Sequence, residues 1–256
     1  GAPAEAHRPT GGEGPVTAVL GVSVGETYAD KFIAASAESE IEQMVDNAKA
    51  AFAACVEALS WMAPATKAEA LKKVETIEVG VGYPDQWRDY GSLQLGPEAY
   101  ANEIAAQKAN YAAQLAKIGK PMDRKEWWMT PQTVNAVNLP VQNALNFPAG
   151  ILQRPFFDAN ADAAYNYGAI GSVIGHEISH GFDDNGAMFD SRGVLRNWWT
   201  PADLARFTKA ADALAAQYDA YEALPGLTLN GKLEPGANSA DVAGLAVAFD
   251  AYKLAL

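Results

Sequence analysis

The sequence predicts a mainly α-helical protein with a small β-sheet, an α+β fold with a helical first half and a mixed second half. Apolar residues recur at helical spacing in several long segments. Short extended segments around a Pro-containing turn occur near the middle of the chain. Gly and Pro interrupt the connections between the helices. A chain of 256 residues is long enough for one large domain or two smaller ones.

The first half, residues 16–124, is expected to contain three helices. It is preceded by residues 1–15, which are rich in Gly and Pro and are expected to form a flexible tail. Apolar spacing, the start at Pro64 and the stop at Gly119-Lys120-Pro121 predict the helices at residues 38–60, 66–77 and 97–118. Between the second and third helices, Gly and Pro indicate an extended connection. We expect a boundary near residue 124.

The second half, residues 125–256, begins with two short extended pieces within residues 133–148. Helices and Gly-punctuated loops then alternate to the end of the chain. In order they are a helix at 165–181, a loop at 182–199, a long amphipathic helix at 202–221, a loop at 224–236 and a helix at 237–256.

Composition excludes some classes of function. The chain has 19 Lys and Arg against 31 Asp and Glu, a net charge of −12, which disfavours binding to nucleic acid or to anionic membranes. No apolar run is long enough to span a bilayer. Cys55 is the only cysteine, so an internal disulfide is excluded, and its apolar helix predicts a buried thiol. The lack of a signal peptide does not establish a cytoplasmic location, and an extracytoplasmic one is slightly favoured.

The pentad His-Glu-Ile-Ser-His, from His176 to His180, carries the most specific chemistry. Its surroundings have helical character, and residues i and i+4 of a helix share one face. The two imidazoles can therefore bind one zinc ion, with ring nitrogens about 3–3.5 Å apart. Glu177 can then reach a water at the metal as a general base. The chain has only 3 histidines, so this spacing is unlikely to arise by chance.

Further segments match one protein family. They are VNA (134–136), FPAGILQRPFF (147–157), NYGAIGSVIGHEISHGFDDNG (166–186), WWT (198–200), LNG (229–231), AYK (251–253), LSWMAPATKAEALKK (59–73) and GYPDQWRDY (82–90). With them the chain resembles the neprilysin family of zinc metallopeptidases. The resemblance implies part of a helical domain, followed by a thermolysin-like zincin catalytic domain. It also implies zinc as cofactor, and peptides as substrates cleaved on the amino side of large apolar residues.

The resemblance assigns roles to individual residues. His176 and His180 correspond to the zinc ligands of the family. Glu177 and Asp241 correspond to catalytic residues, with Glu177 as the general base. Asp183 and Asp241 correspond to carboxylates that orient the two imidazoles, since a ligating His donates its other N–H to such an acceptor.

Five other positions correspond to substrate contacts. Asn135 and Ala136 match an Asn amide and an edge-strand carbonyl that hold the peptide backbone, although Asn135 could instead form a turn. Ile151, Phe156 and Val173 match the lining of an apolar pocket. Packing in the core is an equally good reading of these three.

Two departures from the family set further expectations. Ala237 stands where the family has a third zinc ligand, a Glu four residues before Asp241. Glu234 is a candidate substitute, but Pro235 and Gly236 follow it and place it before the helix. No His corresponds to the family's downstream residue that stabilises the oxyanion. The chain is therefore expected to be truncated at both ends, or to be completed by a second chain or segment.

The expected function is zinc-dependent endopeptidase activity on oligopeptides. The retained pentad favours this reading. Ala237 favours an alternative, a catalytically inactive relative that binds peptides. A third reading is a structural fragment of a larger assembly. The metal content of the purified chain would separate the first two readings.

Overall fold

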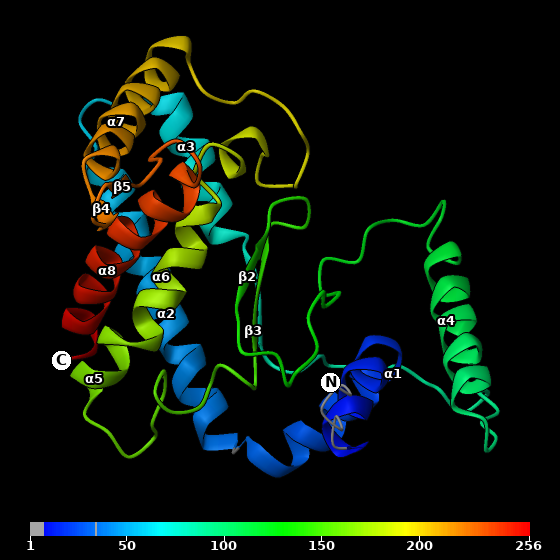
Figure 1. Cartoon of the computed structure of the whole chain (residues 1–256). Helices are drawn as coiled ribbons and strands as arrows, with labels where there is room; N and C mark the ends of the chain where they lie inside the picture. The colour runs from blue at the N-terminus through cyan, green and yellow to red at the C-terminus, as the bar shows by residue number, and fades with distance from the viewer. Residues whose placement is uncertain (1–7, 34) are drawn as a thin grey trace.

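The computed structural model describes residues 8–33 and 35–256 and has the expected mainly α-helical fold with small β-sheets (Figure 1). Residues 1–7 of the expected tail lie outside the described residues. The helices are α1 (Arg8–Phe32), α2 (Ala35–Ala58), α3 (Pro64–Glu75), α4 (Ala99–Leu115), α5 (Ala163–Gly168), α6 (Ile170–His180), α7 (Pro201–Asp219) and α8 (Pro235–Ala255), with a 3₁₀ turn at Gly186–Met188. The strands are β1 (Glu78–Gly82), β2 (Val137–Leu139), β3 (Ala144–Pro148), β4 (Glu222–Leu224) and β5 (Leu227–Thr228). Within the described residues, no helix is long and apolar enough to cross a membrane.

Helix α1 differs from the expected organisation, because residues 8–15 of the expected tail belong to it. The helix is kinked at Leu20, where φ is −126° and ψ is 24°. Gly21 allows a close approach to the segment before β2, since a Cβ there would lie 2.8 Å from the Thr130 methyl group. The Gly-rich composition suggested a tail because Gly weakens an isolated helix. In the structure, packing against a segment far along the chain outweighs this preference.

The main sheet joins the two halves of the chain. Its strand order is β1-β3-β2, with β1 parallel and β2 antiparallel to β3. The first-half strand β1 pairs with β3 from Glu78 opposite Ala144 to Gly82 opposite Pro148. Strand β2 is an edge of this sheet, and the pentad helix α6 packs near it.

The core lies where α2, α6 and α8 pack against one another and the sheet, as Figure 1 shows. It contains fully buried side chains from both sides of residue 124: Ile41, Leu145, Phe147, Ile170, Ile174 and Ile178. A second cluster beneath α3 and α7 contains the adjacent Trp198 and Trp199 together with Val56 and Met62. The elements on either side of the expected boundary therefore share one core. Helix α4 stands apart from this body, and its Asn110 side chain donates to the Val19 carbonyl of α1 at 2.8 Å.

Helices α6 and α8 approach each other closely through two glycines. A Cβ on Gly175 would lie 2.5 Å from the Gly244 carbonyl oxygen, and one on Gly244 would lie 2.6 Å from the His176 backbone nitrogen. Neither position can carry a side chain without moving a helix. This approach brings the first turns of α8 next to the pentad.

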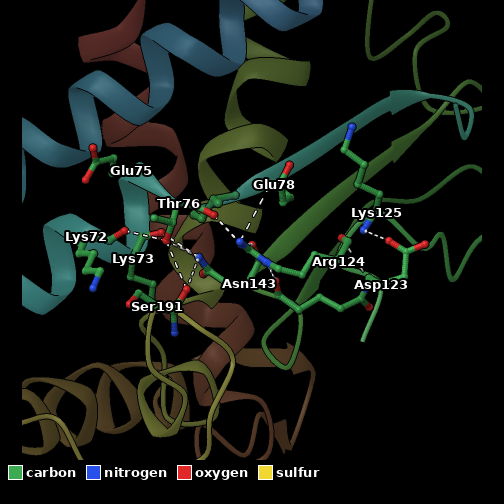
Figure 2. Close-up of polar contacts among 12 residues, drawn as sticks. Lys72, Lys73, Glu75, Thr76, Glu78, Asp123, Arg124, Lys125, Asn143 and Ser191 are labelled. Carbon is green, nitrogen blue, oxygen red and sulfur yellow. Dashed lines mark hydrogen bonds and ion pairs between the residues drawn. The ribbon is translucent and has the colours of Figure 1, made fainter. Parts of the chain in front are cut away.

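A polar cluster fixes the turn between β2 and β3 (Figure 2). The Arg124 guanidinium donates to the carbonyl oxygens of Thr76 at 2.5 Å, Gln142 at 2.7 Å and Asn143 at 3.1 Å. Asn143 has a positive φ of 46° and donates through Nδ2 to the Lys73 carbonyl at 3.0 Å. Arg124 thus ties the end of α3 to the hairpin whose first strand faces α6.

Three further details differ from expectation. Cys55 is exposed rather than buried, with Sγ 3.9 Å from Asp250 Oδ2 of α8. The expected helix at 165–181 is divided at Ala169, where φ is −98° and ψ is −91°. The expected loop at 224–236 begins within the hairpin of β4 and β5, whose residues are exposed and carry little periodic signal.

Candidate metal and active site

The two histidines of the pentad converge on one point. They lie one turn apart on α6, with the two Nε2 atoms 2.9 Å apart and the rings perpendicular at a centroid distance of 4.5 Å. This separation is slightly shorter than the about 3–3.5 Å expected for two ligands of one zinc ion. Each ring is about a quarter exposed, at 23% and 25%, so the Nε2 edges remain accessible.

A carboxylate holds the opposite edge of each ring. His176 Nδ1 lies 2.7 Å from Asp241 Oδ1, and His180 Nδ1 lies 2.6 Å from Asp183 Oδ2. The hydrogen bond to Asp183 raises the pKa of His180. Asp183 is itself fixed, since its Oδ1 accepts from the backbone N–H groups of Asn185 and Gly186. Each of the two aspartates thus contacts one histidine of the pentad.

This donor arrangement fits a cation. An imidazole whose Nδ1–H donates to a carboxylate can present a lone pair on Nε2 to a cation, and the two Nε2 atoms here lie close together. Two acceptor atoms 2.9 Å apart repel each other unless a proton or metal ion lies near both. Neutral imidazole nitrogen is a preferred ligand of zinc. The chemistry of the two rings therefore matches the metal that the sequence predicts.

Glu177 lies beside the rings in a largely buried position, with 6% of its surface exposed. Burial raises the pKa of its carboxyl group to about 7. Its backbone carbonyl accepts a hydrogen bond from Asn138 Nδ2 of strand β2 at 2.7 Å. Strand β2 and helix α6 are thus joined directly at the residue expected to act as the base.

One cavity brings most of these groups together. It has a volume of about 510 Å³. Its walls come from the segment before and within β2, from α6, from the loop after α6 and from the start of α8: Asn135, Ala136, Val137, Asn138, Pro140, His176, Glu177, His180, Asp183, Asp184, Asn185, Leu233, Glu234, Pro235, Gly236 and Ala237. Asn135 and Ala136, the expected peptide-backbone contacts, line the same cavity as the two histidines. Both precede β2, which begins at Val137.

The position of the third ligand is occupied by Ala237. Both Ala237 and Glu234 line the cavity, and Glu234 is the residue that precedes the first turn of α8, as the sequence predicts. Among residues 8–33 and 35–256, no group of three His, Cys, Asp or Glu side chains converges to hold a metal ion. Among the described residues, the two imidazoles therefore converge without a third His, Cys, Asp or Glu side chain beside them.

The three apolar residues that match the lining of a substrate pocket lie outside this cavity. Ile151 is buried in the core, and Phe156 and Val173 pack against the same core while partly buried. None of the three lines the cavity described above. The structure places them where the core-packing alternative expects them.

Sequence reasoning missed two residues that support the site. Asn138 connects β2 to α6, and the buried Lys73 holds the loop after α6 by donating to the Gly186 and Phe189 carbonyl oxygens, both at 2.7 Å. Asn138 follows the singled-out Asn135 and Ala136, and this proximity was the available signal. Lys73 resembles a solvated helix lysine in the sequence, so no local signal could have identified it.

Two family models, both described as Peptidase family M13, match residues 12–84 and 135–256. The chain belongs to peptidase family M13. Among M13 relatives, it is 37% identical over 243 residues to Neprilysin-3 of Drosophila melanogaster, covering 92% of this chain and 31% of the relative. It is 38% identical over 234 residues to the neutral endopeptidase of Lactobacillus helveticus, covering 90% of this chain and 36% of the relative.

Solved M13 structures share the fold. A crystal structure of the zinc metalloprotease Zmp1 of Mycobacterium tuberculosis with an inhibitor matches with a TM-score of 0.86 and 44% identity. That match covers 94% of this chain and 37% of the solved one. PepO of Lactobacillus rhamnosis matches with a TM-score of 0.85 and 36% identity, over 91% and 37% of the two chains. The chain thus spans about a third of the length of these M13 relatives.

Proposed function

We propose that this chain provides the zinc ligands and the general base of an endopeptidase that hydrolyses oligopeptides. The supporting observation is the pair of carboxylate-anchored imidazoles beside the buried Glu177, in a cavity walled by residues 135–138. Membership of a family with relatives named neutral endopeptidase and zinc metalloprotease supports the same reaction class.

Each residue of the site would have a separate role in the reaction. When bound to His176 and His180, zinc would act as a Lewis acid toward the scissile carbonyl. Glu177 would accept a proton from the attacking water and deliver it to the leaving amine. Asp183 and Asp241 would keep both imidazoles in the tautomer that presents Nε2.

Substrate binding would use the part of the cavity that residues 135–138 line. Asn135 and Ala136 would hydrogen-bond the backbone of an extended peptide, as the resemblance implies. We infer from the same resemblance a preference for cleavage on the amino side of large apolar residues. Peptides that differ only in the residue after the scissile bond would test this preference, and equal rates for Gly, Glu and Phe there would refute it. A second chain or segment is proposed to complete the catalytic half.

Ala237 favours a second candidate, an inactive relative that binds peptides. A site with only two protein ligands binds zinc more weakly than the three-ligand catalytic sites of zinc enzymes. In that case the cavity would bind peptides with or without zinc and release them unchanged. Mass spectrometry of peptides incubated with the zinc-loaded chain distinguishes the two candidates.

The decisive variant is Glu177→Gln, which keeps the shape of the side chain but cannot accept the proton from water. We expect peptide hydrolysis to fall by about 10²- to 10⁴-fold. Zinc affinity and the unfolding temperature should change little. Glu57→Gln is the matched control, because Glu57 is an exposed residue of α2 that carries the same charge and lies outside the cavity. Equal hydrolysis by the Glu177→Gln variant and the parent would show that another group is the base.

A further inference from the structure

We propose that a carboxylate of the bound ligand completes the metal site of this chain by occupying the space beside Ala237. The inference rests on the proposed zinc site and identifies the class of ligand that the site selects: peptides that present a carboxylate to the metal.

Asp183 and Asp241 are carboxylates that already contact the two histidines. Asp183 accepts hydrogen bonds through both carboxylate oxygens, and Asp241 accepts from His176 on the side away from Nε2. These two side chains are therefore committed to holding the rings. The described residues provide no third convergent ligand, as noted above. Zinc bound by two imidazoles would keep two positions open, where catalytic sites normally keep one.

The start of α8 lies beside the two imidazoles. Ala237 and Asp241 lie four residues apart on α8 and so share a helix face. Asp241 contacts His176, and Ala237 lines the cavity that contains both imidazoles. The methyl group of Ala237 leaves that side of the cavity open. A ligand group in the cavity that Asn135 and Ala237 both line would have room beside the two imidazoles.

The charges around the cavity decide when an anion can bind there. No side chain caps α8, and its first turn, with Gly236 and Ala237, lines the same cavity. Free N–H groups at a helix N-terminus favour an anion. The cavity is also lined by Glu177, Asp183, Asp184 and Glu234, which repel one when no metal is present. A carboxylate should therefore bind only together with zinc, and each should increase the affinity for the other by the same factor.

The test measures zinc affinity by competition with a chromophoric chelator, at rising acetate and at chloride of matched ionic strength. We expect acetate, but not chloride, to tighten zinc binding in a saturable way, by about 5-fold or more. Ala237→Glu should bind zinc more tightly than the parent and lose most of the acetate response. Ala237→Leu, which fills the space with an apolar group, should bind zinc weakly at every acetate concentration.

Three peptides identify the source of the carboxylate. They are an N-acetylated peptide with a free C-terminus, its C-terminal amide, and an amide with an internal Glu. Tightening of zinc binding by the first alone indicates a C-terminal carboxylate, and tightening by the third indicates a side chain. Both results support the proposal, and equal effects of all three peptides contradict it.

The outcomes separate this inference from the proposed function. Zinc binding that depends on His176 and His180 but is the same in acetate and chloride overturns the carboxylate proposal and leaves the proposed zinc site intact. A large loss of zinc affinity in Glu234→Gln would overturn it as well, by identifying a protein ligand. Zinc binding that is unaffected by His176→Ala would overturn the proposed function itself.

Discussion

Lys73 places a positive charge inside the second apolar cluster. Its side chain is 1% exposed, and its Nζ lies 5.5 Å from the Phe182 ring centroid and 6.0 Å from that of Trp198. Burial lowers the pKa of Lys73 from 10.5 to about 8. The two carbonyl oxygens of the loop after α6 compensate in part for this unfavourable burial.

The shifted pKa of Lys73 predicts a stability that rises with pH. Between about pH 8 and 10.5 the unfolded state binds the proton that the folded state has released, so the free energy of unfolding increases across this window. Comparison with Lys73→Met isolates the effect. From pH 8 to 9.5, the unfolding free energy of the parent should rise by about 1–2 kcal/mol more than that of the variant. Urea unfolding at several pH values measures this difference. If the unfolding free energies of parent and variant changed with pH in parallel, the result would contradict the buried charge.

At the residue scale, the predictable part of the site was the part that is local in sequence. His176, Glu177 and His180 lie within one helical turn, so their spacing alone predicts their convergence. Asp241 lies 65 residues beyond His176 and was identified only through the family resemblance. Lys73 depends on a loop 113 residues away, which no local pattern reveals.

At the scale of elements, the glycine contact between α6 and α8 sets the position of Asp241. Gly175→Ala would add a methyl group 2.5 Å from the Gly244 carbonyl oxygen. Overpacking by about 1–3 kcal/mol should exceed the gain of up to ~1 kcal/mol in helix propensity. We also expect zinc affinity to fall by about 10-fold as Asp241 moves away from His176.

Gly168→Ala is the matched control for this change. Gly168 ends α5, and a Cβ there meets nothing within 4 Å. Denaturant unfolding and chelator competition should show a loss for Gly175→Ala alone. Normal zinc affinity in Gly175→Ala would mean that Asp241 does not depend on the close approach of the helices.

The clamp formed by Arg124 is the second element-scale device. Arg124→Met would remove the donors to Thr76, Gln142 and Asn143 and should lower the unfolding free energy by roughly 2–3 kcal/mol. The neighbouring Lys125 is 68% exposed and forms a surface ion pair with Asp85 at 3.2 Å, so Lys125→Met should change the unfolding free energy by less than ~1 kcal/mol. The two variants lose the same charge. Similar unfolding curves for both would contradict the clamp.

The long helices were predictable because their apolar spacing is strong over many residues. Strand β1 was missed because its five residues acquire their conformation from pairing with β3, which lies about 66 residues away. The hairpin of β4 and β5 was missed because exposed short strands lack periodicity. The break at Ala169 divides a segment whose composition favours a continuous helix.

At the scale of the whole molecule, the two halves of the chain share one core. Helix α2 packs on α6 and α8, and β1 pairs with β3. Composition suggested a boundary near residue 124, because the helical segments precede the mixed ones. Which segments pack together depends on side chains from both halves, and the order of elements along the chain does not reveal it.

The parallel pairing of β1 with β3 has a consequence for a chain that has been cut. Lys117 and Lys120 lie in an exposed turn after α4, where a protease such as trypsin could cleave. The two fragments would remain associated, because the broken segment lies outside the core while the sheet and the α2 contacts cross between them. Such a nicked protein would elute as one species in native buffer and separate only in denaturant. Each fragment alone would expose half of a core, so mixed fragments should regain structure by complementation that neither achieves separately.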